Sequence, residues 1–350
     1  MPDISPVDKT GKSINDSDSY VSQIYCADPT AIEYEGRLYV YATNDHQQYL
    51  FNKEGKNTYE RIKSLVMFST DDMVDWTYHG TIETDLISPY IIASWAPSVV
   101  SRVEKDGRTH FYLYYSNSGW GVGVLTSTSP TGPWTDPIKR SLVDGNTKGL
   151  GEGCTPFDPG VVIDDEGTGW LAFGGSKTHD NPQANYIPGG ARIVKLGDDM
   201  VSLASDIIEI LAPYHFEANE LNYINGTYIY TYNTSWVKRT KWEFDYAAPP
   251  TACCMSYMTS ATPLDSNSWV YRGNYFKNPG ESGFDNSNNH THLHKYKGQY
   301  YLFYHTLALQ KKNNVTGGFR SIAADKADVD EKNLIINMVT PTTTGMIYVK

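Results

Sequence analysis

The sequence predicts an all-β fold and, within that class, a five-bladed β-propeller. One pattern, an apolar stretch followed by a two-residue turn and a strand of alternating residues, occurs five times along the chain, and such repeats are typical of ring-shaped or solenoid folds. Further strand-like segments separate the copies, so each unit holds about four strands, as a propeller blade does. Helical periodicity is scarce, which makes a parallel α/β sheet the weaker alternative.

The first copy, residues 28–43, reads DPTAIEYEGRLYVYAT. From Leu38 to Thr43, apolar residues alternate with tyrosine or threonine, and a period of two indicates a β-strand. The Glu35-Gly36 pair before this strand is typical of a hairpin turn. The segment is therefore predicted to form two antiparallel strands, and strand formation alone does not explain why an aspartate opens it.

Four later copies follow the same plan, each with a turn that ends in glycine and an aromatic-rich strand after it. Their first residues are Ala96, Asp158, Glu217 and His290, and the strands after the turns read RTHFYLYYS, TGWLAFGGS, TYIYTYNTS and QYYLFYHT. Additional strands are predicted within residues 64–76, 122–134, 191–197 and 254–269. Because one closed ring uses the whole chain, we expect a single domain over residues 21–350 and an N-terminal extension over residues 1–20.

Composition narrows the classes of function. The chain has 350 residues, a formal charge of -11 and no run of Lys or Arg, which argues against a nucleic-acid partner. Its 27 Tyr and 8 Trp supply amphipathic rings that suit strand faces and sugar-binding clefts. No stretch resembles a leader or is apolar enough to span a bilayer, so we expect no membrane contact and a cytoplasmic location, or secretion if a leader has been removed. The oligomeric state stays open.

The five starting positions are predicted to converge. The innermost strands of a propeller run in the same direction along the channel, so Asp28, Asp158, Glu217 and His290 should surround one pocket. A single Asp before Pro is usually a local cap of the backbone, but three acids around one axis repel each other and lose hydration. Such crowding moves pKa values apart, so that one carboxyl acts as an acid while another acts as a base.

These segments resemble glycoside hydrolase family 43, and the resemblance covers roughly residues 20–335. The segments ADPTAI, FDPGVVIDDEGTGWLAFG and FEANELNYINGTYIYTY are similar to the family's general-base, second-aspartate and general-acid motifs. NNHTHLHKYKGQYYLFYHT and GGFRSIAADK resemble its fifth-blade histidine and late arginine segments, especially in the arabinofuranosidase and β-xylosidase branch. The resemblance implies a five-bladed propeller and a glycoside hydrolase.

The resemblance also implies roles for individual residues. Asp28 would be the general base, Glu217 the general acid, and Asp158 the residue that orients and tunes the acid. His290 would stand in the central channel, where such enzymes hold a calcium ion or water. Two alternatives remain open in the sequence, because Glu220 lies three residues after Glu217 and the histidine segment reads His-Thr-His, which offers His292 beside His290.

Other polar and aromatic residues are candidates for contact with substrate. Trp95 either stacks on a sugar face or packs between blades. Arg320 either binds sugar hydroxyls or the carboxylate cluster, or forms a surface ion pair. Asn44, followed by Asp45 and His46, comes after the first inner hairpin and is a candidate for the pocket rim.

The predicted function is an exo-acting, inverting glycoside hydrolase that releases terminal α-L-arabinofuranosyl or β-D-xylosyl residues from arabinoxylan-derived oligosaccharides. Three alternatives are an endo-arabinanase, a retaining fructan or sucrose hydrolase, and a noncatalytic carbohydrate-binding propeller. The start around Asp28 lacks the Trp-Met-Asn-Asp-Pro-Asn sequence of the fructan enzymes, and the presence of all three acids disfavours a noncatalytic role. The sequence does not decide between arabinose and xylose.

Overall fold

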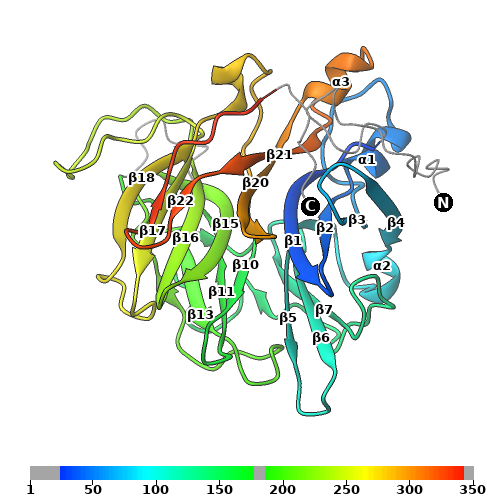
Figure 1. The fold of residues 1–350 in the computed structure, drawn as a ribbon, viewed down its shortest axis with the longest axis horizontal. Helices are drawn as coiled ribbons and strands as arrows, with labels where there is room; N and C mark the ends of the chain where they lie inside the picture. Colours follow the sequence, from blue (N-terminus) through cyan, green and yellow to red (C-terminus); the bar gives the residue numbers. More distant parts are fainter. Residues whose placement is uncertain (1–23, 177–185, 343–350) are drawn as a thin grey trace.

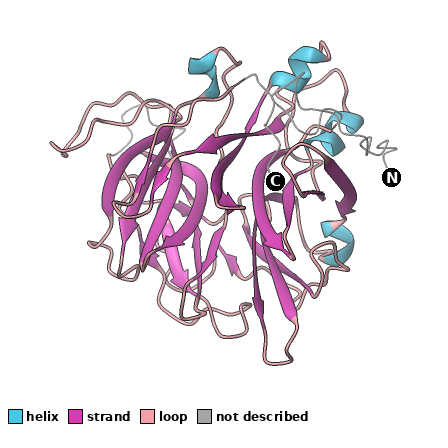
Figure 2. Cartoon of the chain, in the orientation of Figure 1, coloured by secondary structure: helices cyan, strands magenta, loops and turns pink. Residues whose placement is uncertain are grey.

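The computed structural model describes residues 24–176 and 186–342, so the predicted extension over residues 1–20 lies outside the described part. Five small antiparallel sheets stand around a central axis and form a five-bladed β-propeller, which confirms the predicted fold class (Figure 1). Strands form the blades, loops connect them, and the short helices lie at the periphery (Figure 2). Within the described part of the chain, none of the helices has the length and apolar character needed to cross a bilayer.

The first two blades each contain four strands that follow the sequence order from the axis outward. Blade one consists of β1 (Ala27–Tyr34), β2 (Arg37–Thr43), β3 (Leu65–Thr70) and β4 (Trp76–Ile82). Blade two consists of β5 (Trp95–Val103), β6 (Thr109–Ser116), β7 (Gly121–Ser127) and β8 (Val143–Asp144). Helix α1 (Asp45–Phe51) lies in the connection from β2 to β3, and helix α2 (Thr84–Ile87) lies in the connection from β4 to β5.

Blades three and four also have four strands each, whereas blade five has three described strands. Blade three consists of β10 (Gly160–Ile163), β11 (Gly169–Phe173), β13 (Arg192–Lys195) and β14 (Ile208–Glu209), and blade four of β15 (His215–Ile224), β16 (Thr227–Thr234), β17 (Met255–Ser260) and β18 (Val270–Phe276). Blade five has three described strands, β19 (His292–Tyr296), β20 (Gln299–Thr306) and β21 (Ser321–Ala327). Two small ladders, β9 (Cys154–Thr155) with β12 (Gly175–Ser176) and β22 (Val329–Asp330) with β23 (Ile335–Ile336), stand apart, and η1 (Pro279–Ser282) and α3 (Ala308–Lys312) lie in loops.

Apolar packing between neighbouring blades closes the ring. Each of the five junctions between adjacent blades has its own cluster of buried apolar side chains. The junction of the first and last blades joins Leu38, Val40 and Phe68 to Tyr301 and Phe303. Burial of apolar surface is the main favourable contribution to folding, so the first and last blades are held together by the same force as the other neighbouring blades.

A recurring backbone feature starts the inner strands. Asp28, Ala96, Asp158 and Ala218 have φ values of 53°, 41°, 48° and 60°, in the left-handed region. In β1, β5 and β15 the strand pairing shifts at this point, as it does at a β-bulge. A bulge re-aims side chains and is common beside active sites, so the repeated bulge turns the first residues of the inner strands toward one end of the channel.

The pairing corrects the predicted start of the fourth repeat. Regular pairing resumes at Thr30, Ser98 and Glu220 in blades one, two and four. The position two residues earlier, which carries the left-handed backbone, is therefore Ala218 rather than the predicted Glu217. Glu217 stands one residue before the bulge and still reaches the same end of the channel, because the strand bends there.

Candidate active site

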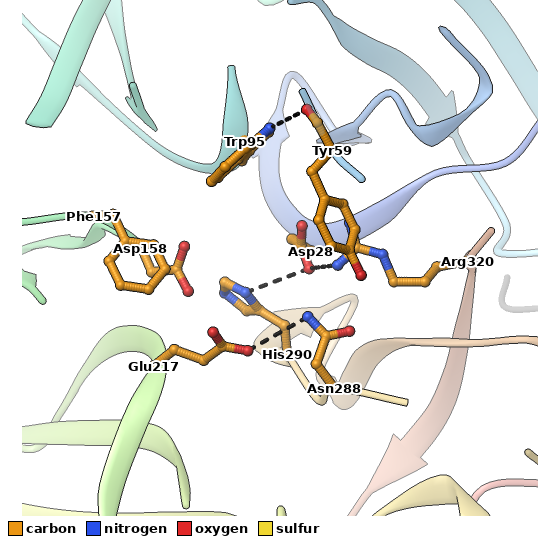
Figure 3. A pocket seen from close by; sticks show the side chains of 9 residues that line it. All are labelled: Asp28, Tyr59, Trp95, Phe157, Asp158, Glu217, Asn288, His290 and Arg320. Atoms are coloured by element: carbon orange, nitrogen blue, oxygen red, sulfur yellow. Dashed lines mark hydrogen bonds and ion pairs between the residues drawn. The ribbon is translucent and has the colours of Figure 1, made fainter. Parts of the chain in front are cut away.

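A small pocket, which we call the acidic pocket, lies at the end of the channel where the inner strands begin. Its cavity volume is about 100 Å³. Figure 3 shows its lining side chains converging from the five blades and their loops. They are Asp28, Tyr59, Trp95, Phe157, Asp158, Glu217, Asn288, His290 and Arg320. The structure therefore brings together every predicted site residue except Asn44.

Asp28 is buried and bound by partners from both ends of the chain. Thr43 Oγ1 donates to its Oδ2 across 2.8 Å, and Arg320 Nη1 donates to its Oδ1 across 2.9 Å. Nδ1 of His290 lies 3.6 Å from the same Oδ1. Burial alone raises the pKa of this carboxyl, but the positive charge of Arg320 acts in the opposite direction, and the pKa is held well below its usual range,. Asp28 is therefore ionised at any working pH.

His305 connects the backbone of Asp28 to the opposite side of the acidic pocket. Nδ1 of His305 accepts from the backbone N–H of Asp28 across 3.3 Å, and Nε2 lies 2.9 Å from the carbonyl oxygen of Asn288. Because a carbonyl oxygen only accepts, Nε2 must carry the proton and Nδ1 the free electron pair. His305 thus bridges the start of blade one and the loop before blade five.

Asp158 is held by the neighbouring blades. Ser116 Oγ lies 3.3 Å from its Oδ1, and the backbone N–H of Ala218 donates to its Oδ2 across 2.9 Å. Burial and the nearby charge of Asp28 raise the pKa of Asp158 to about 7, although these hydrogen bonds act in the opposite direction. The hydrogen bond from the backbone N–H of Ala218 places this carboxyl beside the residue that follows Glu217.

Glu217 lies across the acidic pocket and tends to keep its proton. Burial and then the charges of Asp158 and Asp28 raise the pKa of Glu217 to about 8. Asn288 Nδ2 donates to its Oε1 across 3.4 Å, which partly opposes this rise. A protonated Glu217 therefore faces an ionised Asp28 within one pocket at neutral pH.

The geometry separates Glu217 from its neighbour Glu220. Glu220 lies one layer deeper in the channel, where its carboxylate accepts from His292 Nδ1 across 2.9 Å and from the backbone N–H of Leu221 across 3.1 Å. Gly160 permits this layer to pack closely, since a Cβ atom there would come within 2.4 Å of the Cα of Glu220. Glu217 and His290 line the acidic pocket, whereas Glu220 and His292 belong to the channel below it.

Aromatic rings form one wall of the acidic pocket. Trp95 Nε1 donates to the carbonyl oxygen of Tyr59 across 3.1 Å, and the two rings meet nearly edge to face with centroids 6.1 Å apart. The guanidinium of Arg320 lies over the ring of Tyr59, 4.9 Å from its centroid. Trp95 therefore presents its ring to the cavity while its polar atom is satisfied, as sugar contact requires.

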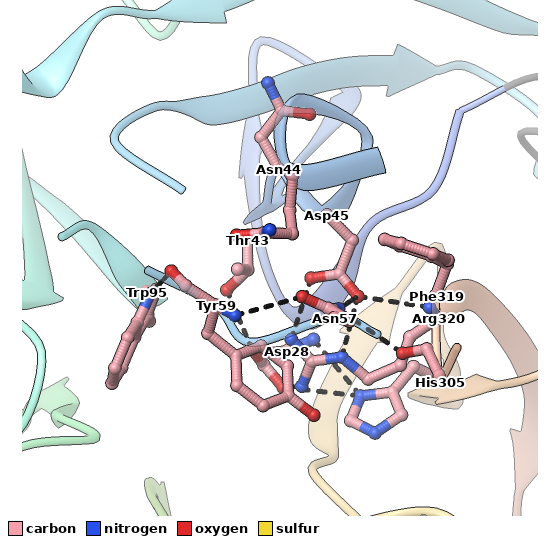
Figure 4. A network of polar contacts seen from close by, with 12 residues as sticks. Asp28, Thr43, Asn44, Asp45, Asn57, Tyr59, Trp95, His305, Phe319 and Arg320 are labelled. Atoms are coloured by element: carbon pink, nitrogen blue, oxygen red, sulfur yellow. Dashed lines mark hydrogen bonds and ion pairs between the residues drawn. The ribbon is translucent and has the colours of Figure 1, made fainter. Parts of the chain in front are cut away.

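The structure places Asn44 away from the acidic pocket, contrary to its predicted place at the rim. Its side chain accepts from the backbone N–H of Gln47 at the start of α1 and donates to Ser64 Oγ across 2.9 Å. Asn is a preferred residue at the N-cap because its short side chain reaches an unpaired helical N–H. In Figure 4, Asn44 points away from Asp28, and it is the buried side chain of Asp45 that faces Arg320.

His290, the residue that the resemblance associates with calcium, lines the acidic pocket beside Asp28. Calcium takes six to eight oxygen ligands, and the nearest carboxylate, Asp28, already binds Arg320. Among the residues that the structure describes, no group of three or more His, Cys, Asp or Glu side chains is arranged to hold a metal ion.

Sequence reasoning missed three lining residues. Phe157 directly precedes Asp158, and Asn288 lies two residues before His290. Their closeness in the sequence to predicted site residues was a signal that could have identified them. Tyr59 comes from the loop after α1 and adopts a left-handed backbone with φ 64°. The sequence contained no signal for it, because its position depends on contacts with Trp95 and Arg320 from other blades.

Comparisons with known proteins agree with the fold and the resemblance. The sequence model described as "Glycosyl hydrolases family 43" matches residues 19–334. An arabinoxylan arabinofuranohydrolase of Paenibacillus polymyxa is 34% identical over 91% of this chain and 51% of its own length. One of Bacillus subtilis is 37% identical over 89% of this chain and 61% of its own length. The chain thus spans about half to three fifths of these curated relatives.

Solved structures give the same picture. A family 43 arabinoxylan arabinofuranohydrolase from Bacillus subtilis, in complex with cellotetraose, has a TM-score of 0.86 and 33% identity, over 97% of this chain and 71% of that chain. An α-L-arabinofuranosidase from Clostridium thermocellum has a TM-score of 0.68 and 32% identity, over 93% of this chain and 97% of that chain. A β-xylosidase/α-arabinofuranosidase from a compost metagenome, 22% identical with a TM-score of 0.69 over 96% and 99%, was solved in a calcium-free form and supports the fold. The family match, the similar sequences and the shared propeller together show that this chain belongs to glycosyl hydrolase family 43.

Proposed function

We propose that this chain is an inverting glycoside hydrolase that removes terminal α-L-arabinofuranosyl or β-D-xylosyl residues from arabinoxylan-derived oligosaccharides. The observation that carries the proposal is the opposite protonation of two carboxyl groups in one small pocket. Asp28 has a lowered pKa and is ionised, whereas Glu217 has a raised pKa and keeps its proton at neutral pH. Inverting glycosidases need one carboxylate as base and one carboxylic acid as proton donor.

In the proposed reaction, Asp28 accepts a proton from water while the water oxygen attacks the anomeric carbon. Room for that water requires the two carboxyl groups to stand ~6.5–9.5 Å apart. The bond from the anomeric carbon to the leaving oxygen breaks, and Glu217 donates its proton to that oxygen. Asp28 then carries a proton and Glu217 a charge, and exchange of both protons with solvent restores the starting state.

Asp158 supports the acid through its position and charge. Its pKa is itself raised, so it and Glu217 share protons over the same pH range,. An ionised Asp158 disfavours a charge on Glu217 and so helps Glu217 to keep its proton. The hydrogen bond from Ala218 N to Asp158 Oδ2 holds the carboxyl of Asp158 against the backbone of the residue that follows Glu217.

The size of the acidic pocket supports release of a single sugar. Its cavity volume of about 100 Å³ is well below the ≈300–1,000 Å³ of sites that hold drug-sized ligands. A cavity of this size favours a single sugar ring as the group that enters it. The names of the similar proteins from Paenibacillus polymyxa and Bacillus subtilis favour arabinose as the sugar and arabinoxylan as its source.

Calcium, as the sequence resemblance implies, would lie in the central channel beside His290 and act in a structural or tuning role. The calcium-free form of the compost metagenome enzyme supports calcium binding in that protein. Treatment with a chelator followed by calcium addition tests this point. If the chelator lowers activity or thermal stability and calcium restores it, a bound calcium ion is supported. If neither treatment changes activity or thermal stability, the proposal of a bound calcium ion is contradicted.

The experiment that tests the proposal measures product and stereochemistry together. The chain is assayed with nitrophenyl α-L-arabinofuranoside, nitrophenyl β-D-xyloside and arabinoxylan oligosaccharides, and proton NMR follows the anomeric configuration of the first product. We expect release of monosaccharide with inverted configuration. Retained configuration would indicate a covalent intermediate. Cleavage of linear arabinan into oligosaccharides would indicate an endo-arabinanase, and binding without cleavage would indicate a noncatalytic propeller.

A further inference from the structure

We propose that Asp45 is a positioning residue for the catalytic base, because it holds the guanidinium of Arg320 so that a single N–H donor, at Nη1, reaches Asp28. The inference rests on the proposed function, which assigns Asp28 as the base. Asp45 itself does not line the acidic pocket. Its effect on the reaction must therefore pass through Arg320.

The carboxylate of Asp45 is buried and accepts several hydrogen bonds, unlike a side chain at the rim of a pocket. It begins helix α1, and its side chain is fully buried. Oδ2 accepts from Asn57 Nδ2 across 2.9 Å, from the backbone N–H of Arg320 across 3.1 Å and from Arg320 Nε across 2.9 Å. Oδ1 accepts from Arg320 Nη2 across 2.8 Å. Four hydrogen bonds fix the carboxylate, as a buried charge requires.

These contacts divide the donors of Arg320 between two carboxylates. Asp45 takes Nε and Nη2, which form one edge of the planar guanidinium, in a bidentate pair,. Nη1 remains for Asp28 Oδ1, 2.9 Å away, and the ring of Tyr59 covers the guanidinium. Figure 4 shows Arg320 lying between Asp45 and Asp28.

The division matters for a base that must meet water. If Asp45 did not bind one edge of the guanidinium, that edge would be free to form a bidentate pair with Asp28, which is the stronger arrangement for Arg and a carboxylate. Both oxygens of Asp28 would then be bound to the same cation and less available to a water proton. Asp45 prevents this rearrangement and leaves the second oxygen of Asp28 with Thr43, a single neutral donor.

The test replaces Asp45 with Asn, which keeps the shape and removes the charge. We expect kcat on nitrophenyl α-L-arabinofuranoside to fall by about 10²-fold, the scale of a small misplacement of a catalytic group, while KM changes less than about twofold. The matched control is Asp72→Asn, in the same blade, where the buried carboxyl accepts from the backbone N–H groups of Val74 and Asp75. This control should keep the kcat of the wild type.

A double-variant cycle separates positioning from a general structural role. If Asp45 acts through Arg320, adding Asp45→Asn to Arg320→Met leaves kcat within about twofold of Arg320→Met alone. A further loss equal to that of the single Asp45 variant would overturn the inference. Should Asp45→Asn fail to fold, Asp45→Glu carries the test, since it keeps the charge and shifts the carboxylate by one methylene. Loss of kcat at an unchanged Tm is expected for it, and full kcat would overturn the inference.

The pH profile supplies a second readout. Removing the charge of Asp45 leaves the positive charge of Arg320 less balanced, and Arg320 already lowers the pKa of Glu217. The basic limb of kcat should therefore move to lower pH by up to about one unit, and it should not move in Asp72→Asn. If the wild-type chain hydrolyses none of the substrates, the proposed function fails. If the wild type is active and Asp45→Asn keeps both its kcat and its basic limb, only this inference fails.

Discussion

The side-chain amide of Asn288 donates a hydrogen bond to Oε1 of Glu217 across 3.4 Å. A donor at this place favours the ionised carboxylate, so it lowers a pKa that burial, Asp158 and Asp28 raise,. The same asparagine accepts from His305 Nε2 through its carbonyl oxygen. Asn288 thus sets how firmly Glu217 holds its proton, and it does so from a loop that His305 anchors to the backbone of Asp28.

Replacement of Asn288 by Ala should move the basic limb of the pH profile to higher pH. Loss of the hydrogen bond removes one contribution that lowers the pKa of Glu217, so the acid stays protonated further into the alkaline range. The shift should be about half a unit to one unit, as for the loss of a single hydrogen bond. Initial rates between pH 5 and pH 10 measure it, and a shift toward lower pH would contradict the assignment of Glu217 as the acid.

Asp28→Asn should lower kcat by ~10²–10⁴-fold, the usual contribution of general-base catalysis. The amide keeps the shape and can still accept from Arg320 or Thr43, but it cannot take a proton from water. Circular dichroism and Tm report whether the fold survives. A folded variant that retains more than about half of the wild-type activity would remove Asp28 from the mechanism.

Glu217→Ala and Glu220→Ala should respond differently to the leaving group. A proton donor matters most when the leaving oxygen is a poor leaving group, so Glu217→Ala should nearly abolish hydrolysis of natural oligosaccharides and affect dinitrophenyl glycosides much less. Glu220 binds His292 in the channel below, and its loss should affect both substrates alike through packing. A leaving-group dependence confined to Glu220→Ala would reassign the acid.

Glu217→Gln should reduce the pH dependence of stability between pH 5 and pH 8. The folded-state pKa of Glu217 is raised to about 8, against about 4.3 in an unfolded chain. Its contribution to stability is therefore full below about pH 4 and is lost as pH rises toward 8. Over this window Asp28, with its lowered pKa, stays ionised in both states.

Denaturant titrations at the two pH values measure this effect. The free energy of unfolding of the wild type should fall between pH 5 and pH 8 by on the order of 1–3 kcal/mol more than that of Glu217→Gln, given about 1.4 kcal/mol per pKa unit. Asp158→Asn serves as a companion variant with the same expected sign, because its pKa is raised to about 7. An equal or larger fall in both variants would show that neither carboxyl holds a proton in the folded protein.

The repeats were visible in the sequence because a period of two is a local property. Residues 38–43, for example, alternate in a way that only a strand with two different faces explains,. The convergence of Asp28 and Asp158 followed from topology, since equivalent positions of a ring meet at its axis. Neither inference required knowledge of any contact between distant side chains.

The register of blade four and the place of Asn44 needed the structure. The left-handed backbone falls on Ala218, a residue type with no preference for that conformation,, so nothing in the sequence marked the bulge one position after Glu217. Asn44 follows a strand and precedes only seven helical residues, too short a stretch for the helical period to be recognised. A polar residue there fits a pocket rim and a helix cap equally well.

The ring closure has a consequence for the protein during its synthesis. Asp28 is made early, but its partner Arg320 follows 292 residues later and His305 follows 277 residues after the backbone N–H that it accepts. At about 20 residues per second, a ribosome needs about 15 seconds to pass from the first partner to the last. Until then the nascent chain holds the future base without the cation that fixes its charge state. A chain released before its fifth blade would already contain Asp28, Asp158 and Glu217, but it would lack Arg320 and His305. We expect such a chain to be inactive, so activity should begin only after the fifth blade has been synthesised.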